Sequence, residues 1–336
     1  MRHKISMKPK IAIVIEDRGS DYRFIIDYAN KQGFDCIWRP LESHSGKQEI
    51  IETLSDCDAV IAGGQAYNEG IFEALAPKLK IIARFGIGYE HVDLDSATNY
   101  GIAVSNTPGA MSAGVAELAI TMMLAIGRQI HRFDASIKSG GWDARFMGSG
   151  LEGKTVGIVG YGNIARQLCK YLSGFNCPIL AYDVFFPEGM RLPDNVTKAD
   201  LETVARESDY VSLHLPATKD TLGLVGKDFF NKMKPTAFLI NTARGGVVVE
   251  DEMIEALKAR RIAGAALDVF EVEPLPENSE LRKLDNCIYT PHIASYTYET
   301  VARSAFQAID NISDLFMGKT PRNILNPGYN KGGAAE

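Results

Sequence analysis

The sequence predicts an α/β fold with two parallel-sheet domains. Three observations support this: a length of 336 residues, an alternation of short β-branched runs with helix-length segments, and a glycine-rich turn near residue 160. At about 150 residues per domain, the length indicates about two domains. Strands that alternate with helices form a parallel sheet with helices on both faces.

The first alternating series covers about the first hundred residues. An apolar strand at 11–15 precedes a helical pattern over 21–31, in which apolar side chains recur on one face. Gly33 lies just past that pattern, where glycine commonly ends a helix. The other strands of this series are short apolar runs at 59–62, 80–83 and 102–104.

A second alternating series begins at Lys154. It follows a long apolar helix at 112–128 and a loop rich in glycine and aromatic residues at 139–153. A last helical pattern covers 297–317, and the tail at 327–336 is expected to be flexible. The predicted strands of the second series are the runs 155–159, 179–182, 210–214, 237–241, 264–267 and 287–289.

Composition restricts the partners. Lys and Arg number 36 and Asp and Glu 42, so the formal net charge is −6. This balance disfavours nucleic acid, because neutralising phosphates needs a basic surface. No apolar run approaches the roughly 18 to 20 residues of a membrane span. Five widely spaced cysteines and no leader pattern predict a reduced, cytoplasmic protein without a metal site.

The most informative segment is KTVGIVGYGNIA at 154–165, a strand, a glycine-rich turn and a helix. Gly160 permits the tight turn, Gly162 lets the backbone approach a pyrophosphate, and Ala165 allows close helix packing. The helix N-terminus offers N–H groups and positive potential to the phosphates. Asp183 follows the next predicted strand, where a carboxylate binds ribose hydroxyls and repels a 2′-phosphate. The segment predicts NAD as cofactor, with a generic strand–turn–helix as the alternative.

Three later segments place polar residues at the carboxyl ends of predicted strands, where parallel sheets bind ligands. The guanidinium of Arg244 is suited to hold the carboxylate of a 2-keto acid. His292 is suited to donate a proton to the developing alkoxide, or to accept one in the opposite direction. A carboxylate partner for this imidazole is available at Glu273 or Glu271, and strand alternation does not distinguish them. The alternative for Arg244 is a surface or ion-pair residue, and the alternative for His292 is a residue that only forms a turn.

The segments TARGG, LDVFEVEP and TPHIAS, with the glycine-rich turn ahead of them, resemble those of the D-isomer-specific 2-hydroxyacid dehydrogenase family. The segment ARFGIGYEHVDLDSATNYGIAVSNTPG is similar to the family's substrate domain, and the similarity extends over 10–326. The resemblance implies two Rossmann-like parallel-sheet domains. A flavodoxin-like substrate domain (1–105 and 296–326) is interrupted by an NAD-binding Rossmann domain (106–295), with the active site expected in the cleft between them.

The resemblance also implies the catalytic roles. Arg244 binds the carboxylate and carbonyl of the substrate, and His292 is the general acid and base. The choice between the two glutamates falls on Glu273, which directly precedes Pro274. The implied activity is reversible hydride transfer between NAD(H) and a small 2-hydroxy or 2-keto acid.

The binding residues follow from the same resemblance. Backbone N–H groups of Gly86, Ile87 and Gly88 are expected to hold the substrate carboxylate opposite Arg244. Asp268 is expected near the nicotinamide end of the cofactor. The residues implied to line the dinucleotide are Gly160, Gly162, Asn163, Ile164, Asp183, Thr242, Ala243, Arg244, Asp268, His292, Ala294 and Ser295.

The sequence does not distinguish between several possible substrates. The segment from Gly141 to Thr155 is similar to that of phosphoglycerate dehydrogenases, although the chain is expected to lack their C-terminal regulatory domain. Arg84 is a candidate phosphate ligand, with a structural ion pair as its alternative. Because 63–68 contains no Arg or Lys, glyoxylate, hydroxypyruvate or a branched 2-keto acid are alternative substrates. An NAD(H)-binding, corepressor-like scaffold is the alternative of another class. A homodimer is expected through the apolar helix at 112–128.

Overall fold

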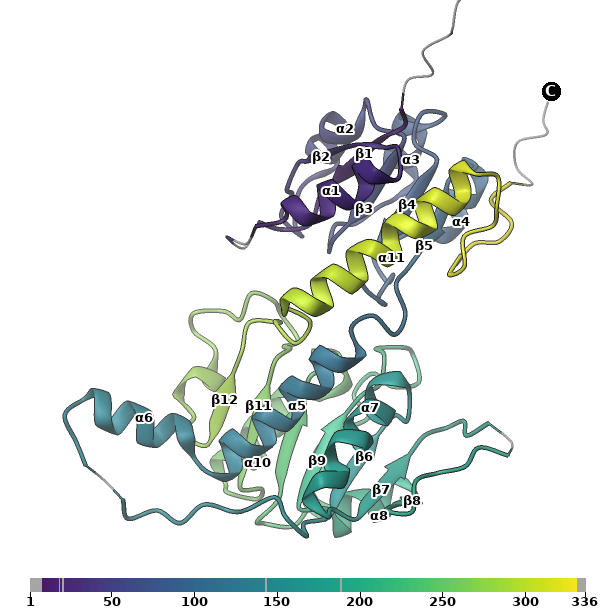
Figure 1. Ribbon diagram of the computed structural model, residues 1–336. Coiled ribbons are helices and arrows are strands. Elements are labelled where there is room, and N and C mark those ends of the chain that lie inside the picture. The colour runs from purple at the N-terminus through teal and green to yellow at the C-terminus, as the bar shows by residue number, and fades with distance from the viewer. Residues whose placement is uncertain (1–7, 18, 20, 143, 188, 331–336) are drawn as a thin grey trace, which may run out of the picture. The chain divides into compact units, whose positions relative to one another are not determined.

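The computed structural model describes residues 8–17, 19, 21–142, 144–187 and 189–330 (Figure 1). The chain divides into two compact units. Unit 1 comprises Met1–Met111 and Thr297–Glu336, and unit 2 comprises Ser112–Tyr296. Each unit contains one parallel sheet, of five and seven strands, which confirms the predicted α/β class.

The first unit boundary falls a few residues after the expected domain limit at 105. The segment that follows strand β5 (Ala103–Ser105) stays with unit 1 through its hydrogen bonds. The hydroxyl of Thr107 accepts the N–H of Gly86 at 2.9 Å, and the side-chain amide of Asn311 donates to the carbonyl of Asn106 at 3.1 Å. These bonds tie the segment to the loop after strand β4 (Ile81–Arg84) and to the last helix.

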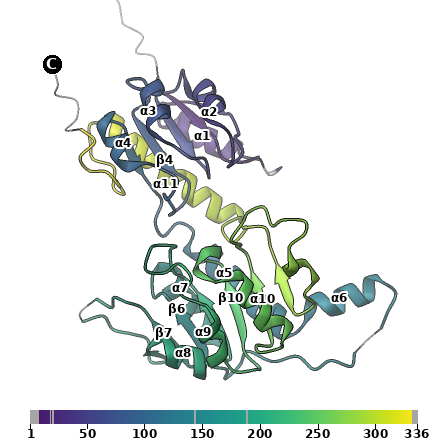
Figure 2. The same ribbon diagram turned by 180° about the vertical axis from the view of Figure 1, so that it is seen from behind.

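Unit 1 is a three-layered α/β structure. Its elements are β1 (Lys10–Ile13), α1 (Arg23–Lys31), β2 (Asp35–Trp38), α2 (Lys47–Leu54), β3 (Ala59–Ala62), α3 (Glu69–Leu75), β4 (Ile81–Arg84), α4 (Leu94–Asn99), β5 (Ala103–Ser105) and α11 (Tyr298–Phe316). The strand order β2-β1-β3-β4-β5 is the flavodoxin-like order. Ile11 and Ile13 of β1 pack with α1 and α11, whereas Ala12 and Val14 pack with α2 and α3 (Figures 1 and 2). The alternation of strand side chains therefore builds one core on each face of the sheet.

Unit 2 has the second parallel sheet. Its elements are α5 (Ser112–Gly127), α6 (Ile130–Lys138), β6 (Val156–Val159), α7 (Asn163–Leu172), the 3₁₀ helix η1 (Ser173–Phe175), β7 (Ile179–Tyr182), β8 (Val196–Lys198), α8 (Leu201–Glu207), β9 (Tyr210–Leu213), α9 (Lys227–Lys232), β10 (Phe238–Asn241), η2 (Gly245–Val247), α10 (Glu250–Lys258), β11 (Gly264–Leu267), η3 (Glu280–Lys283) and β12 (Cys287–Tyr289). The order β12-β11-β10-β9-β6-β7-β8 is the Rossmann order extended by one strand. Helices α5 and α7 cover one face, and α8, α9 and α10 cover the other (Figure 2).

The structure also bears on two expectations from the sequence, a flexible tail at 327–336 and the absence of a membrane span. Of the predicted tail at 327–336, the structure describes 327–330, a turn in which Tyr329 is half-buried against the core formed with α1 and α11. Within the described residues, no single helix has the length and hydropathy of a membrane span. Helices α5 and α6 meet such a criterion only together, as a pair bent by 65°.

Candidate active site

Most of the predicted site residues of unit 2 lie where four strands end. Asp183 follows β7, Arg244 lies three residues after β10, Asp268 follows β11, and His292 lies three residues after β12. All strand pairs of this sheet are parallel, so these ends share one edge. Ligands of parallel sheets bind at this carboxyl edge.

The glycine-rich turn between β6 and α7 is shaped by two glycines with different constraints. Gly160 has a φ of +94°, and an added Cβ would lie 2.8 Å from the carbonyl oxygen of His214. A side chain there would be strained and would collide with the neighbouring loop. At Gly162, just before α7, an added Cβ would meet no atom within 4 Å. The backbone at Gly162 is therefore open to close approach, and Ala165 is fully buried under the helix.

The carboxylate of Asp183 is held beside this turn. Its Oδ2 accepts the backbone N–H of Tyr161 at 2.6 Å, and its Oδ1 accepts that of Phe185 at 3.0 Å. A carboxylate has about four acceptor positions, so each oxygen can accept a further hydrogen bond. The arrangement is suited to ribose hydroxyls next to a pyrophosphate.

The turn that carries Arg244 is braced by two residues that the sequence patterns did not single out. The side chain of Asn241 accepts the N–H of Ala243 and donates to the carbonyl of Arg244, both at 3.0 Å. At Gly245, an added Cβ would lie 1.9 Å from the carbonyl oxygen of Phe270. Only glycine permits this close approach between the loops after β10 and β11. A polar residue at the end of an apolar strand was the available signal for Asn241.

Thr242, on the same turn, has a buried hydroxyl oxygen without a hydrogen-bond partner among the described residues. Buried polar atoms are almost always hydrogen-bonded, so an orphaned hydroxyl indicates a position where a ligand can bind. Together with the open backbone at Gly162 and the carboxylate of Asp183, it fits a dinucleotide.

His292 and Glu273 form the central contact of the site. Nδ1 of His292 lies 2.7 Å from Oε2 of Glu273, and these side chains are 47% and 36% exposed. The other oxygen of Glu273 accepts the N–H of Phe270 at 3.0 Å. Glu271 does not take this place; its N–H instead donates to the carboxylate of Glu250 at 3.3 Å. Because Nδ1 faces the carboxylate, Nε2 is the nitrogen left for proton transfer.

The charge of Glu273 is set by this contact. Burial favours its neutral form, but the hydrogen bond from His292 and the positive potential of His292, the amide of Phe270 and the guanidinium of Arg244 outweigh it. Together they hold the pKa of Glu273 below its ordinary value. The carboxylate is thus ionised near neutral pH.

Asp268 shapes the loop that carries His292. Its buried carboxylate accepts the hydroxyl of Thr290 at 2.5 Å and the N–H groups of Ile293 and Ala294 at 2.8 Å. Its carbonyl oxygen accepts the N–H of His292, whose φ is +52°. Burial raises the pKa of Asp268, although these hydrogen bonds oppose the shift. The structure therefore assigns Asp268 a part in folding this loop, and its expected place near the nicotinamide stays a prediction.

In unit 1, the loop after β4 contains two backbone donors. Within the part of the chain that the structure describes, the N–H groups of Ile87 and Gly88 have no acceptor. Gly86 differs from the expectation, since its N–H already donates to Thr107 and to the carbonyl of Arg84. Its φ of +131° instead lets the chain turn. Two successive donors of this kind can bind a carboxylate.

Arg84 lies beneath this loop. It is 6% exposed, its Nε donates to the carbonyl of Gly88 at 3.2 Å, and its Nη1 donates to the carbonyl of Gly63.

For metals, no group of three or more His, Cys, Asp or Glu side chains within the described ranges is arranged to bind an ion.

Comparison with known proteins places these features in context. Residues 120–294 match the family model described as "D-isomer specific 2-hydroxyacid dehydrogenase, NAD binding domain". The chain is 42% identical over 328 residues to a glyoxylate reductase of Thermococcus litoralis, covering 95% of this chain and 97% of the relative. It is 37% identical over 302 residues to a D-3-phosphoglycerate dehydrogenase of Archaeoglobus fulgidus, covering 90% of this chain but 57% of that protein. The solved structure of TT0316 protein from Thermus thermophilus superposes with a TM-score of 0.84 and 29% identity, covering 94% of this chain and 99% of that one.

Proposed function

We propose, for a chain that belongs to the D-isomer specific 2-hydroxyacid dehydrogenase family, that it interconverts a small 2-hydroxy acid and its 2-keto acid with NAD(H). The observation that carries the proposal is the 2.7 Å contact between His292 and Glu273. This contact lies at the carboxyl edge of the sheet whose strand β6 leads into the glycine-rich turn. A proton-transfer pair and a dinucleotide-binding turn on one sheet edge are what this reaction requires.

Gly160, Gly162 and Asp183 would hold NAD(H), which would supply the hydride-transfer chemistry. In the reductive direction, Nε2 of His292 donates a proton to the carbonyl oxygen as negative charge develops there. In the oxidative direction, the neutral imidazole accepts the hydroxyl proton. The carboxylate of Glu273 stabilises the imidazolium and fixes the ring orientation.

The remaining residues bind and orient. Arg244 binds the substrate carboxylate and polarises the adjacent carbonyl, because its planar guanidinium matches both acceptors. The N–H groups of Ile87 and Gly88 in unit 1 are proposed as the further carboxylate donors. The remaining residues proposed along the dinucleotide are Asn163, Ile164, Thr242, Ala243, Asp268, Ala294 and Ser295.

For the substrate, the relatives point in two directions. Glyoxylate reductases and D-3-phosphoglycerate dehydrogenases both align with the chain at similar identity. The test is NADH oxidation against a panel of glyoxylate, hydroxypyruvate, phosphohydroxypyruvate and branched 2-keto acids, repeated with NADPH. Turnover of one of them with NADH is the expected result. Tight NADH binding with no turnover across the panel would contradict the proposal and favour the corepressor-like scaffold.

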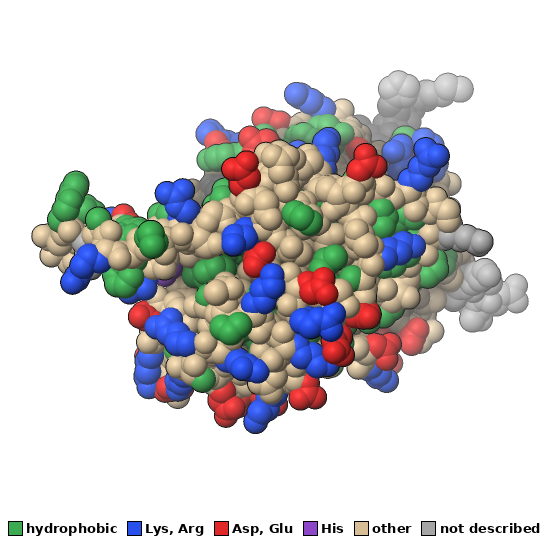
Figure 3. Space-filling view, turned by 90° about the horizontal axis from the view of Figure 1, so that it is seen from below, with side chains coloured by type: hydrophobic (Ala, Val, Ile, Leu, Met, Phe, Trp, Pro, Cys, Tyr) green, Lys and Arg blue, Asp and Glu red, His purple; other side chains and the backbone are tan. Residues whose placement is uncertain are grey.

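A homodimer is the proposed assembly. The helix expected to form its contact, at 112–128, corresponds to α5, which packs into the core of unit 2, so we propose the segment after it as the contact. Helix α6 has no buried residue, and α6 with the chain after it extends from unit 2 as an arm (Figure 1). Figure 3 shows hydrophobic side chains gathered on this protruding arm, which includes Trp142 (89% exposed) and Met147 (95% exposed). Exposed apolar side chains in one segment are typical of an interface. We expect sedimentation analysis to show a dimer. The double substitution W142S/M147S should weaken this dimer, whereas the control M317S, at an exposed methionine of unit 1, should not. A monomeric wild type would contradict the proposal.

We further propose that the protein acts in a reducing, cytoplasmic environment. Its five cysteines are all free and buried. Burial raises the pKa of Cys36 and of Cys169 to about 12, which keeps both thiols protonated and unreactive. Unmodified thiols in the protein purified from its own cells, measured by mass after alkylation, would support this; a disulfide would contradict it.

A further inference from the structure

Arg84 joins two loops that follow neighbouring strands. It is the last residue of β4, and it lies opposite Ala62, the last residue of β3. Its Nη1 donates to the carbonyl of Gly63 after β3, and its Nε donates to the carbonyl of Gly88 after β4. Two donors of one rigid guanidinium therefore link the loop after β3 to the loop after β4.

The loop after β3 is also held from its other side. Gln65 is fully buried, and its amide donates to the carbonyl of Val14 at 2.9 Å and to that of Leu41 at 2.8 Å. Farther along, backbone bonds from Tyr67 to residues 91 and 93 join the two loops again. Arg84 makes the link at the near end, beside the donor groups of Ile87 and Gly88.

We propose that Arg84 is a positioning residue that holds the Gly63 and Gly88 loops at a set separation, so that the N–H groups of Ile87 and Gly88 face the substrate carboxylate. The inference rests on the proposed function. According to this proposal, the guanidinium of Arg84 donates hydrogen bonds to two backbone carbonyls and does not bind a substrate phosphate.

The substrate class follows from this assignment. A phosphate that took the guanidinium of Arg84 would leave the part-buried carbonyls of Gly63 and Gly88 without their donor, which costs free energy. The loop at 63–68 has no other cation, and its Gln65 and Tyr67 side chains are neutral and buried. Burial raises the pKa of the Tyr67 hydroxyl, although the charge of Arg84 opposes the shift. The substrate is therefore a small 2-keto acid whose substituent carries no phosphate.

Two substitutions separate the roles of Arg84. Arg84→Lys keeps the positive charge but replaces the planar fork by one ammonium that cannot span both carbonyls in the same way. Arg84→Met removes charge and donors while keeping much of the volume. The matched control is Arg39→Met, which removes another guanidinium of unit 1 that donates to a backbone carbonyl, that of Thr53. The kinetic readouts are KM and kcat for glyoxylate, hydroxypyruvate and phosphohydroxypyruvate, with the Kd for NADH.

We expect both Arg84 variants to raise KM about tenfold or more for each keto acid that the enzyme uses, with smaller changes in kcat and none in NADH binding. The Arg39 variant should keep the wild-type KM. If Arg84→Lys retains the wild-type KM, the positioning role is wrong. If Arg84→Met impairs phosphohydroxypyruvate about tenfold more than hydroxypyruvate, or if the wild type uses phosphohydroxypyruvate best, Arg84 is a phosphate ligand instead.

Hydrogen exchange supplies a readout that does not depend on catalysis. Loss of the link should speed amide exchange in peptides that cover 63–68 and 86–92 in both Arg84 variants, and not in Arg39→Met. This result is expected even if the enzyme turns over none of the keto acids, so a failure of the proposed function is distinguishable from a failure of the link. Unchanged exchange in both peptides would overturn the proposal.

Discussion

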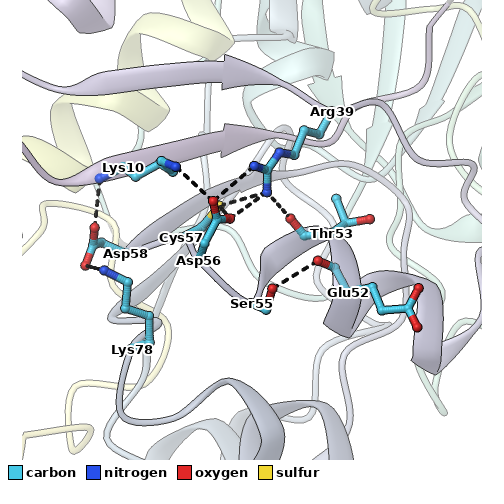
Figure 4. A network of polar contacts seen from close by, with 9 residues as sticks. All are labelled: Lys10, Arg39, Glu52, Thr53, Ser55, Asp56, Cys57, Asp58 and Lys78. Carbon is cyan, nitrogen blue, oxygen red and sulfur yellow. Dashed lines mark hydrogen bonds and ion pairs between the residues drawn. The ribbon is translucent and has the colours of Figure 1, made fainter.

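Paired charges occur at the amino edge of the unit 1 sheet and at the carboxyl edge of the unit 2 sheet, and the two groups differ in kind. At the amino edge, Lys10 begins β1, while Asp58 and Lys78 precede β3 and β4 (Figure 4). Arg39, which follows β2, reaches into the same group and contacts Asp56. We call these five residues the amino-edge network. At the carboxyl edge of the other sheet lies the His292–Glu273 pair.

The amino-edge network places two cations around Asp56 and one beside Asp58. Asp56 contacts Arg39 at 2.6 Å and Lys10 at 2.8 Å, and Lys78 contacts Asp58 at 2.7 Å. The hydrogen bonds from Arg39 and then Lys10 hold the pKa of Asp56 well below its ordinary value. Asp56 therefore stays ionised throughout the neutral range and has no proton to exchange there.

The His292–Glu273 pair has one member whose side-chain type changes charge near neutral pH. It is also half-exposed and lies on a loop that the buried carboxylate of Asp268 shapes. The comparison teaches that an ion pair becomes suited to chemistry through three properties. They are a titratable member, access for a ligand, and a rigid support that does not itself exchange the proton.

The largest expected effect comes from removing the titratable member. His292→Ala should lower kcat about 10²- to 10⁴-fold, because no group remains to transfer the proton. NADH affinity should stay close to wild type, since Asp268 still binds the N–H groups of the loop. Steady-state kinetics and NADH fluorescence titration measure both. The control is His44→Ala, at an exposed histidine of unit 1; equal losses of turnover and NADH affinity would mean that the His292 substitution disturbs the fold instead.

Glu273→Gln tests the partner of the imidazole. Without the carboxylate, the protonated imidazole is less favoured, so the descending limb of the pH–rate profile for keto-acid reduction should move to lower pH. Glu271→Gln is the matched control, and its profile should match the wild type. A Glu273→Gln profile that coincides with the wild type would remove Glu273 from the mechanism.

A third prediction concerns another carboxylate at the same edge, Asp183. Asp183→Ala combined with Val184→Arg should shift the NADPH/NADH ratio of kcat/KM about tenfold or more toward NADPH, by removing the repulsion and adding a cation. Val184 is 83% exposed, so the arginine can stay in solvent. Val184→Arg alone is the control and should shift the ratio less. Should the unmodified enzyme already prefer NADPH, the role of Asp183 is misassigned.

The smallest effect is expected at the amino-edge network. Arg39→Met should lower the free energy of unfolding by about 1 kcal/mol or less, as for exposed ion pairs, and leave kcat unchanged. The folded-state pKa of Asp56 is depressed, so its stabilisation is present above the unfolded pKa of about 3.9 and is lost as pH falls below it. The difference from wild type should therefore shrink between pH 7 and pH 3 in urea titrations. A loss of activity without a loss of stability would mean that this network belongs to the site.

The elements that the sequence predicts best are strands that stand out as short apolar runs. β3, β7, β11 and β12 have the expected bounds, because an apolar run of three or four residues between polar turns is readable on its own. The edge strands β2 and β8 were not anticipated. Each buries a single residue, Cys36 and Val196, so neither is a buried strand of the core.

Local patterns also indicated the residues of the proposed site. Gly160, Gly162 and Asp183 are recognisable because a tight turn, a close approach and a carboxylate after the next strand each demand a residue type at a given spacing. The same local logic indicated Arg244 and His292 as polar residues after apolar strands. These features depend on residue type and near neighbours, so one sequence suffices to predict them.

The tertiary structure decided how these residues meet. It shows which of two glutamates two positions apart contacts His292, that the N–H of Gly86 is already bound by Thr107, and that Arg84 donates to two backbone carbonyls. The sequence determined most of the strands, the glycine-rich turn and the residue types at the strand ends. Only the packing of loops that follow different strands decided their partners, because such contacts join residues far apart in the chain and leave no local pattern.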